Sequence, residues 1–344
     1  MMLYNKNAPE WILGEGPESD VVISTRARLA RSLAAYPFPS RLSGEDSKMV
    51  VQEVKGASVG LTNRFPGLKM IAMDRMDADR KDYLLDAHLI SYEQTEDRPG
   101  TAVLLEPAGI LSIMVNEEDH LRIQVIKSGL VAEEVWEMAD WADDVLSADL
   151  RFGYSSEYGY LTADVSNVGT GLRISAMMHL VGLAWKNRIV SQLRAAYDLG
   201  VSVRGLFGEA SLPVGDFYQV SNEITLGFSE REIVQRVDSV AQYLLREERT
   251  AREELVAEQR DRLVDQANKA LEVLRHSRSI SSEKAITLMS PVRLAASTGL
   301  IKDCSPRLLN QLLVGMRVNV SDGIRAGIER AELLRNELTG FNAG

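Results

Sequence analysis

Two hydrophobic patterns divide the chain. In its first part, short apolar runs such as 21–24 and 102–105 alternate with helix-like segments and glycine-containing turns, which is typical of strands interleaved with helices. Residues 186–199 are predicted to form a helix that Gly200 ends, because glycine readily adopts the conformation that closes a helix. From about residue 249, charged helical patterns dominate. The sequence therefore predicts a mixed region followed by a helical one.

The change between the two regions starts at Ser229. Ser229 and Glu232 have the spacing of a capping box, which predicts the start of a long helix. The apolar positions of this helix are Ile233, Val237, Val240 and Leu244. We place a domain boundary within it, so that residues 1–248 form one domain and residues 249–344 a helical domain.

Composition limits the possible functions. The chain has 344 residues, of which 45% are hydrophobic and 26% charged, as in ordinary globular proteins. It has no apolar run of the roughly 18 residues that a spanning helix needs and no signal-peptide core, so we expect a cytoplasmic protein without a membrane partner. Its one cysteine, Cys304, rules out an internal disulfide and a thiolate metal site. The net charge of −10 disfavours binding to nucleic acid.

The most informative motif is the run Asn-Glu-Glu-Asp-His-Leu-Arg at residues 116–122, which follows an apolar strand-like run at 110–115. Carboxylates in this setting can hold a planar cation such as guanidinium, and Arg122 indicates an anion next to it. His120 could line a nucleotide site or be structural. A solvated acidic turn is the alternative interpretation of the whole run.

A second motif is rich in arginine. If residues 24–31 leave a strand, Arg26 and Arg28 lie on one face of it, because side chains alternate along a strand. Two guanidinium groups on one face suit polyphosphate oxygens, since each can bind two of them. An exposed basic edge strand is the alternative.

Two glycine-containing loops complete the set. Residues 164–173 combine two glycines with Arg173, but they match neither a Walker loop nor a dinucleotide fingerprint. Residues 204–209 add Arg204 for phosphate and Glu209 for a cation. Each loop alone could be an ordinary surface loop.

Together the motifs S-T-R-x-R at 24–28, N-E-E-D-H-L-R at 116–122, S-N-x-G-T-G-L-R at 166–173 and R-G-x-x-G-E at 204–209 resemble the signature of the ATP:guanido phosphotransferase family. Within that family the chain is most similar to the bacterial protein-arginine kinases. The resemblance implies an α+β fold in which helices flank an antiparallel β-sheet. It also implies that the C-terminal helical domain serves dimerisation and binds phosphoarginine.

The resemblance implies roles for individual residues. Those expected to bind ATP are Ser24, Arg26, Arg28, His88, Arg122, Arg173 and Arg204. Glu118 and Glu209 are expected to hold the substrate guanidinium, with Glu118 as the base. The reaction is then in-line transfer of the γ-phosphate from Mg-ATP to a guanidinium nitrogen. Arginines suit the phosphate half, because phosphoryl transfer depends on positioning and charge neutralisation. Carboxylates suit the acceptor half, because guanidinium must lose a proton to attack.

The chain departs from the family at Asp164, where the family usually has cysteine followed by proline. The family's cysteine acts as a thiolate near the guanidinium, and aspartate also supplies an anion of similar reach. Three carboxylates around one cation would raise one another's pKa until a guanidinium relieves the repulsion. We therefore expect Asp164 to be catalytic with Glu118 and Glu209. A degenerate, non-catalytic pseudokinase or scaffold is the alternative.

A second departure lies near the C-terminus. The protein-arginine kinases carry an R-D-x-x-R-A motif that binds phosphoarginine, whereas this chain has Ser321 in place of the first arginine. Asp322 and Arg325 could still contact a guanidinium and a phosphate. A helix N-cap at Ser321 is the alternative.

The resemblance also bears on substrate and partners. Kinases of small guanidino compounds carry a helical domain of roughly a hundred residues, the size of a small domain, before the S-T-R motif. Here that motif begins at Ser24, which favours an open site for arginine on another protein over a small compound such as free arginine. The family implies a homodimer, a role in the stress response, a zinc-containing activator and a Clp-type protease as partners.

Overall fold

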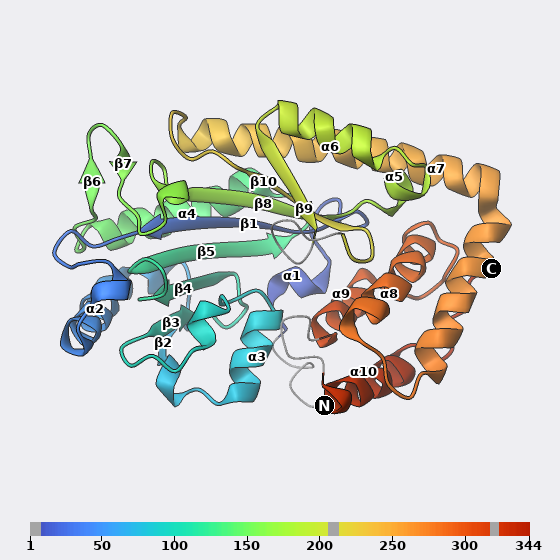
Figure 1. Cartoon of the computed structure of the whole chain (residues 1–344), viewed down its shortest axis with the longest axis horizontal. Coiled ribbons are helices and arrows are strands. Elements are labelled where there is room, and N and C mark those ends of the chain that lie inside the picture. The colour runs from blue at the N-terminus through green and yellow to red at the C-terminus, as the bar shows by residue number, and fades with distance from the viewer. Residues whose placement is uncertain (1–7, 206–212, 317–322) are drawn as a thin grey trace.

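An eight-stranded antiparallel sheet forms the centre of the molecule. The computed structural model describes residues 8–205, 213–316 and 323–344. The strands lie in the order β2-β3-β4-β5-β1-β8-β10-β9, and Figure 1 shows them side by side across one half of the molecule. They are β1 (Val22–Arg31), β2 (Lys69–Ala72), β3 (Ala102–Leu105), β4 (Leu111–Val115), β5 (Leu121–Ser128), β8 (Leu172–His179), β9 (Val201–Gly205) and β10 (Phe217–Asn222). A separate hairpin joins β6 (Tyr154–Ser155) to β7 (Gly159–Tyr160).

The predicted antiparallel sheet with flanking helices is confirmed, and its strands follow the hydrophobic pattern. The run at 102–105 is β3, and the run at 21–24 begins β1, which continues through the arginine-rich motif. Within β1, Ala27 and Leu29 enter a hydrophobic core, whereas the alternate residues face the other side of the sheet.

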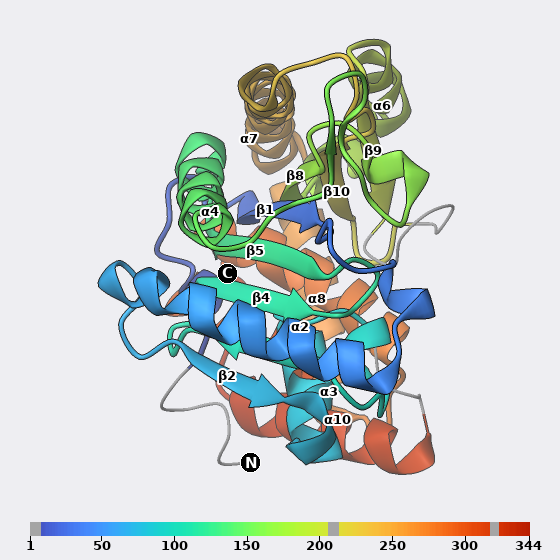
Figure 2. The same ribbon diagram turned by 90° about the vertical axis from the view of Figure 1, so that its left-hand side faces the viewer.

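Helices cover the core face of the sheet. The main ones are α4 (Ala132–Ser147) and the first half of α7 (Glu230–His276), and Figure 2 shows both above β1 and β5, with α2 (Gly44–Ala57) in front. The capping box of α7 is confirmed, since the Ser229 hydroxyl accepts from the Glu232 amide and a Glu232 carboxylate oxygen accepts from the Ser229 amide. The remaining elements on this side are α5 (Val181–Trp185) and α6 (Ile189–Asp198).

The helix predicted at 186–199 is shorter than expected. It begins only at Ile189, because Asn187 adopts a left-handed conformation with φ of 56° and separates it from α5. Its predicted end is confirmed, since α6 ends at Asp198 and Gly200 has φ of 74°. The hydrophobic pattern does not indicate the turn at Asn187, so the predicted helix began too early.

A second core joins the C-terminal helices to the sheet. It combines the second half of α7 with α8 (Ser282–Ser297), α9 (Pro306–Gly315) and α10 (Ile324–Glu337). Ile23 and Ile126 of the sheet belong to the same core. Residues of α1 (Glu10–Leu13) and α3 (Ala78–Asp86) also belong to it. Five 3₁₀ turns complete the described chain: Pro39–Arg41, Ser58–Asn63, Met73–Arg75, Glu93–Thr95 and Val165–Asn167.

The long helix α7 spans both parts of the molecule. It has 47 residues with one non-helical residue at Gln259, where its direction changes. The boundary that we place between residues 248 and 249 therefore lies inside a continuous helix rather than in a linker. No described helix has both the length and the apolar character that crossing a bilayer requires.

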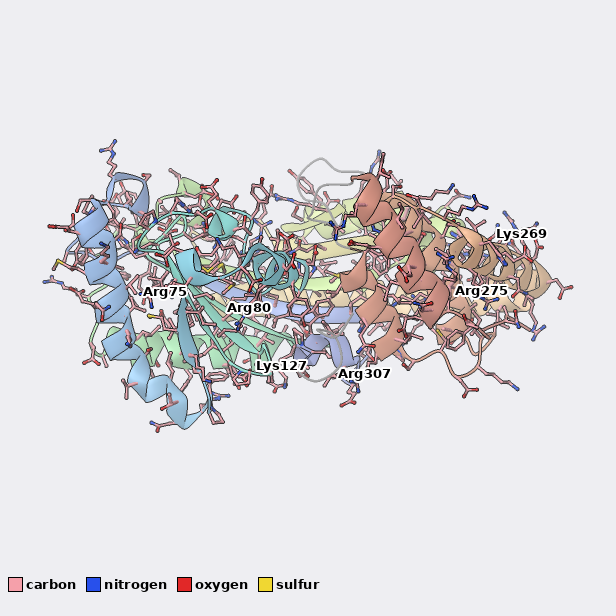
Figure 3. The ribbon with its side chains drawn as sticks, turned by 90° about the horizontal axis from the view of Figure 1, so that it is seen from below. Arg75, Arg80, Lys127, Lys269, Arg275 and Arg307 are labelled. Atoms are coloured by element: carbon pink, nitrogen blue, oxygen red, sulfur yellow. The ribbon has the colours of Figure 1, made fainter. Side chains whose placement is uncertain are left out.

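Basic side chains on the underside come from both parts of the molecule. Figure 3 shows Lys127 on the sheet side and Lys269 and Arg275 on α7. Lys127 pairs with Glu134, and Lys269 pairs with Asp265. In each pair, the carboxylate offsets the positive charge of the lysine.

Candidate active site

The sheet face opposite the first core carries the predicted arginines, and on this face Arg26 lies opposite Ile126 of the second core. Arg26 and Arg28 are two residues apart on β1 and share this face. Arg28 lies directly opposite Arg173 on β8, and Ala30 lies opposite Arg122 on β5. The antiparallel register therefore brings four arginines from three motifs together on three adjacent strands.

The charges of these arginines act on one another. Burial lowers the pKa of Arg26 to about 10, and the positive charges of Arg173 and Arg122 contribute. Burial lowers the pKa of Arg28 well below its usual value, with Arg26, Arg122 and Arg173 as further causes. Arg26 and Arg28 nevertheless remain partly exposed. Concentrated positive charge of this kind is stabilised when a polyanion binds.

His88 lies against the same arginines. Burial and then the charges of Arg26 and Arg28 lower the pKa of His88 to about 3, so its ring is neutral at physiological pH. Its backbone has φ of 59°, and its carbonyl accepts from Gln124 Nε2 at 2.7 Å. The Trp11 ring lies 5.7 Å from the His88 ring. This left-handed conformation costs a non-glycine residue some free energy, and the contacts of His88 hold it in place.

Ser24 and Arg204 share a row across the sheet. Ser24 on β1 lies opposite Met177 on β8, Met177 lies opposite Gln219 on β10, and Gln219 lies opposite Arg204 on β9. Arg204 Nε donates to the Ser202 hydroxyl at 3.0 Å. Ser24 is buried, whereas Arg204 is partly exposed at the outer strand of the sheet.

Two neighbouring glutamates bind Arg122. Its NH1 donates to Glu117 at 2.8 Å and its NH2 to Glu118 at 3.0 Å. Glu117 is buried and accepts from Ser91 Oγ at 2.5 Å and from the Glu118 amide at 3.0 Å. Glu118 is 39% exposed. The sequence analysis identified Glu118 as a site residue but missed Glu117, which orients Arg122. The two glutamates differ in burial, which the sequence does not show.

The negative charge of Asp164 also affects the pKa of Glu118. Burial raises the pKa of Glu118 and Arg122 opposes this, while the negative charges of Glu117, Asp164 and Asp119 raise it further. The Asp164 carboxylate accepts from the amide and the hydroxyl of Ser166 at 2.9 and 2.8 Å. Two of the three predicted catalytic carboxylates therefore lie within electrostatic reach of each other.

The loop that carries Asp164 is attached to the sheet and to a distant segment. Asp119 Oδ1 accepts from the Ser32 hydroxyl at 2.6 Å and from the Ala163 amide at 2.7 Å. Thr225 Oγ1 donates to the carbonyls of Ser166 and Val168 at 2.9 and 2.7 Å. These contacts set the position of Asp164.

His120 has a structural contact. Its Nδ1 accepts from the Leu33 amide at 3.2 Å, the ring is fully buried, and burial lowers its pKa to about 4. The acidic run therefore contains scaffold residues as well as site residues, and the structural interpretation of His120 is favoured.

Three predicted residues lie outside the described parts of the chain: Glu209 between β9 and β10, and Ser321 and Asp322 before α10. Arg325 is described and lies on α10, not on the sheet. Its side chain is 93% exposed and pairs with Glu329 at 2.9 Å. Gly323, rather than Ser321, is the N-cap residue of α10.

Within residues 8–205, 213–316 and 323–344, no group of three or more His, Cys, Asp or Glu side chains could hold a metal ion.

Comparison with known proteins places these observations in a family. Residues 49–251 match the family described as ATP:guanido phosphotransferase, C-terminal catalytic domain. Residues 260–343 match the family described as protein-arginine kinase McsB C-terminal domain. A protein-arginine kinase of Halothermothrix orenii is 40% identical and covers 98% of both chains. That of Moorella thermoacetica is 39% identical over 99% of this chain and 100% of its own.

Solved structures share the fold. Lombricine kinase superposes with a TM-score of 0.60 at 24% identity, covering 70% of this chain and 71% of its own. The duplicated taurocyamine kinase of Schistosoma mansoni, with transition state analog components bound, gives 0.62 at 22% identity over 69% of this chain and 34% of its own. The sheet and its flanking helices are therefore those of guanidino kinases.

Proposed function

The chain belongs to the ATP:guanido phosphotransferase family, and from this premise we propose that it is a protein-arginine kinase. It transfers the γ-phosphate of ATP to the guanidinium group of arginine side chains in proteins. The observation that carries the proposal is the arginine cluster of three adjacent strands beside the carboxylates of Glu118 and Asp164. One half suits a polyphosphate and the other suits a planar cation.

The arginines form the nucleotide half. Arg26, Arg28, Arg122, Arg173 and Arg204 would neutralise the phosphate oxygens, on which negative charge is spread during transfer. Ser24 and neutral His88 would line the same nucleotide. Mg²⁺ enters as part of the substrate Mg-ATP, because phosphate oxygens supply the ligands that hard cations prefer.

The carboxylates form the acceptor half. Glu118, Glu209 and Asp164 would fix the guanidinium plane, and Glu118 would take the proton that the attacking nitrogen loses. The P–N bond forms as the bond from the γ-phosphorus to the ADP oxygen breaks. Arg122, which bonds to both Glu117 and Glu118, links the two halves and makes their relative position stiff.

Asp164 would replace the thiolate that the family usually has. Its carboxylate already raises the pKa of Glu118, which is the repulsion expected of two carboxylates that lie close together. A bound guanidinium would relieve this repulsion and favour the ionised form of Glu118. This supports an active enzyme rather than a pseudokinase.

The family implies the cellular setting. We propose a cytoplasmic homodimer that acts in the stress response, with a zinc-containing activator and a Clp-type protease as partners. Residues Asp322 and Arg325 would retain part of a phosphoarginine site. Titration with free phosphoarginine should then change activity or oligomeric state, and an absence of both effects would exclude that site.

The function is tested by incubating the protein with Mg-ATP and a basic protein, then detecting acid-labile phosphate on arginine by mass spectrometry. Free arginine serves as the competing substrate. Glu118→Gln should lower the rate about 10²–10⁴-fold, the usual contribution of a general base. A parent protein that phosphorylates neither substrate would contradict the proposed activity.

The role of Asp164 has its own test. Asp164→Ala should lower kcat about tenfold or more, equivalent to roughly 1.4 kcal/mol of barrier, because the guanidinium loses one anion. Asp164→Cys should preserve or raise the rate, since a thiolate can replace the carboxylate. An alanine variant as active as the parent would exclude a catalytic role for Asp164.

A further inference from the structure

Exposed apolar side chains gather around the loop that carries Asp164. They come from the β6–β7 hairpin, the loop at 161–170 and the segment at 223–227. Val165, next to Asp164, is 83% exposed, and Tyr154 is 64% exposed. We call the following exposed residues the apolar rim: Tyr154, Tyr158, Leu161, Val165, Ile224 and Leu226.

Backbone contacts join the three segments into one surface. Tyr160 and Gly169 exchange backbone hydrogen bonds of 2.8 and 3.3 Å, and the Thr170 amide donates to the Thr225 carbonyl at 3.0 Å. The approach is close: a Cβ atom on Gly169 would lie 2.4 Å from the Thr225 carbonyl oxygen. The hairpin, the loop and the segment around Thr225 therefore lie edge to edge.

The rim is held rigidly from beneath. The Arg31 guanidinium lies 3.6 Å from the centre of the Tyr160 ring, and Arg31 NH1 donates to the Thr170 carbonyl at 2.8 Å. Arg31 is itself fixed by Asp143 through bonds of 2.9 and 3.0 Å. The Tyr154 ring packs edge-on against Tyr160 at 5.4 Å. A preformed surface loses little entropy when it binds a partner.

The charge of the rim segments has one sign. Tyrosines aside, their ionisable side chains are Glu157, Asp164 and Glu223, and they contain no lysine, arginine or histidine. Glu157 and Glu223 are exposed. Acidic groups among apolar ones complement a polypeptide in which apolar residues flank an arginine.

We propose that the apolar rim binds the substrate polypeptide on either side of the target arginine, and selects arginines that have apolar neighbours in an extended segment. Isolated exposed apolar residues are ordinary, but six of them on segments joined edge to edge around a candidate catalytic carboxylate are typical of an interaction surface. The inference rests on the proposed function and narrows its substrate class.

The test compares two arginine peptides of equal length and charge, one with leucine and valine beside the arginine and one with serine there. We expect the parent to prefer the apolar peptide in kcat/KM. Tyr158→Ser combined with Val165→Ser should reduce that preference about tenfold, mainly through KM, since partial burial of two apolar side chains is worth that factor. Leu226→Ser, on a different segment, should reduce it in the same direction.

Tyr197→Ser is the matched control, because Tyr197 is 66% exposed, more than Tyr158 at 49%, but lies on α6. It should leave the preference unchanged. If the parent is active and every rim variant keeps the preference for the apolar peptide, the inference is wrong but the proposed function still stands. The inference is also wrong if rim variants change the sedimentation of the protein but not its preference, since the rim would then be a contact between copies. A parent inactive on both peptides, free arginine and a basic protein would overturn the proposed function itself.

Discussion

At the scale of single residues, opposing electrostatic effects act on the pKa of Glu118. Burial and the charges of Glu117, Asp164 and Asp119 raise its pKa, whereas Arg122 lowers it, and the net direction is upward from 4.5. A general base acts only when deprotonated. Activity should therefore be present above the raised pKa of Glu118 and be lost as the pH falls through it.

Asp164→Asn tests this coupling. Removing one negative charge should lower the pKa of Glu118 and move the acid limb of the kcat/KM profile to lower pH, even if the plateau rate falls. The measurement is the pH dependence of kcat/KM for free arginine or a peptide. Asp149→Asn, a change at an exposed carboxylate beyond the end of α4, should not move the limb. An unchanged limb in Asp164→Asn would mean that Asp164 does not influence the base.

At the scale of elements, the site depends on how an irregular loop is fastened. The loop at 161–170 has no strand or long helix to position Asp164. Instead Thr225, about sixty residues later in the chain, donates to two of its carbonyl groups. The arginines, in contrast, lie on paired strands of the central sheet. The two halves of the site are therefore held by different kinds of structure.

Thr225→Val should disturb the loop of Asp164 but not the arginines on the sheet. Valine keeps the shape of threonine but removes the donor, at a net cost of roughly 1 kcal/mol in stability. We expect kcat to fall while the KM for ATP stays constant, because the arginine strands are untouched. Steady-state kinetics at varied ATP would check this, with Thr250→Val on the exposed surface of α7 as the control. A KM for ATP that rises as much as kcat falls would contradict the separation.

At the scale of the whole molecule, two cores share one long helix. The first half of α7 packs with the core face of the sheet, and its second half packs with α8, α9 and α10. The second core also contains Ile23 and Ile126 of the sheet. Side chains link the two parts as well: Ser290 of α8 bonds to His179 at 3.0 Å and to Asp216 at 2.9 Å. The helical part is therefore expected to unfold together with the sheet.

Leu271→Ala tests this cooperativity. Leu271 is fully buried in the second core, and its truncation should destabilise the protein by about 2–5 kcal/mol. Heat inactivation of the kinase and loss of helical circular dichroism should both shift downward by several degrees, and by the same amount. Val273→Ala, at an exposed position of the same helix, should shift neither by more than a degree or two. Kinase activity that persists at the parent's temperature after helix is lost would show that the two parts unfold independently.

Local pattern in the sequence determined much of this protein. Alternation along β1 put Arg26 and Arg28 on one face, and Ser229 with Glu232 began α7. The spacing of four motifs indicated the family, and the comparisons confirm it. These features depend on residues close together in the chain, whose geometry follows from backbone conformation alone.

Only the tertiary structure decided the rest. Strand register put Arg173 opposite Arg28, burial distinguished Glu117 from Glu118, and a hydrogen bond from Thr225 positioned the loop of Asp164. Each of these facts joins segments that are far apart in sequence. Their contacts depend on how sheets, helices and loops pack together, and a single sequence does not encode that packing in any local pattern.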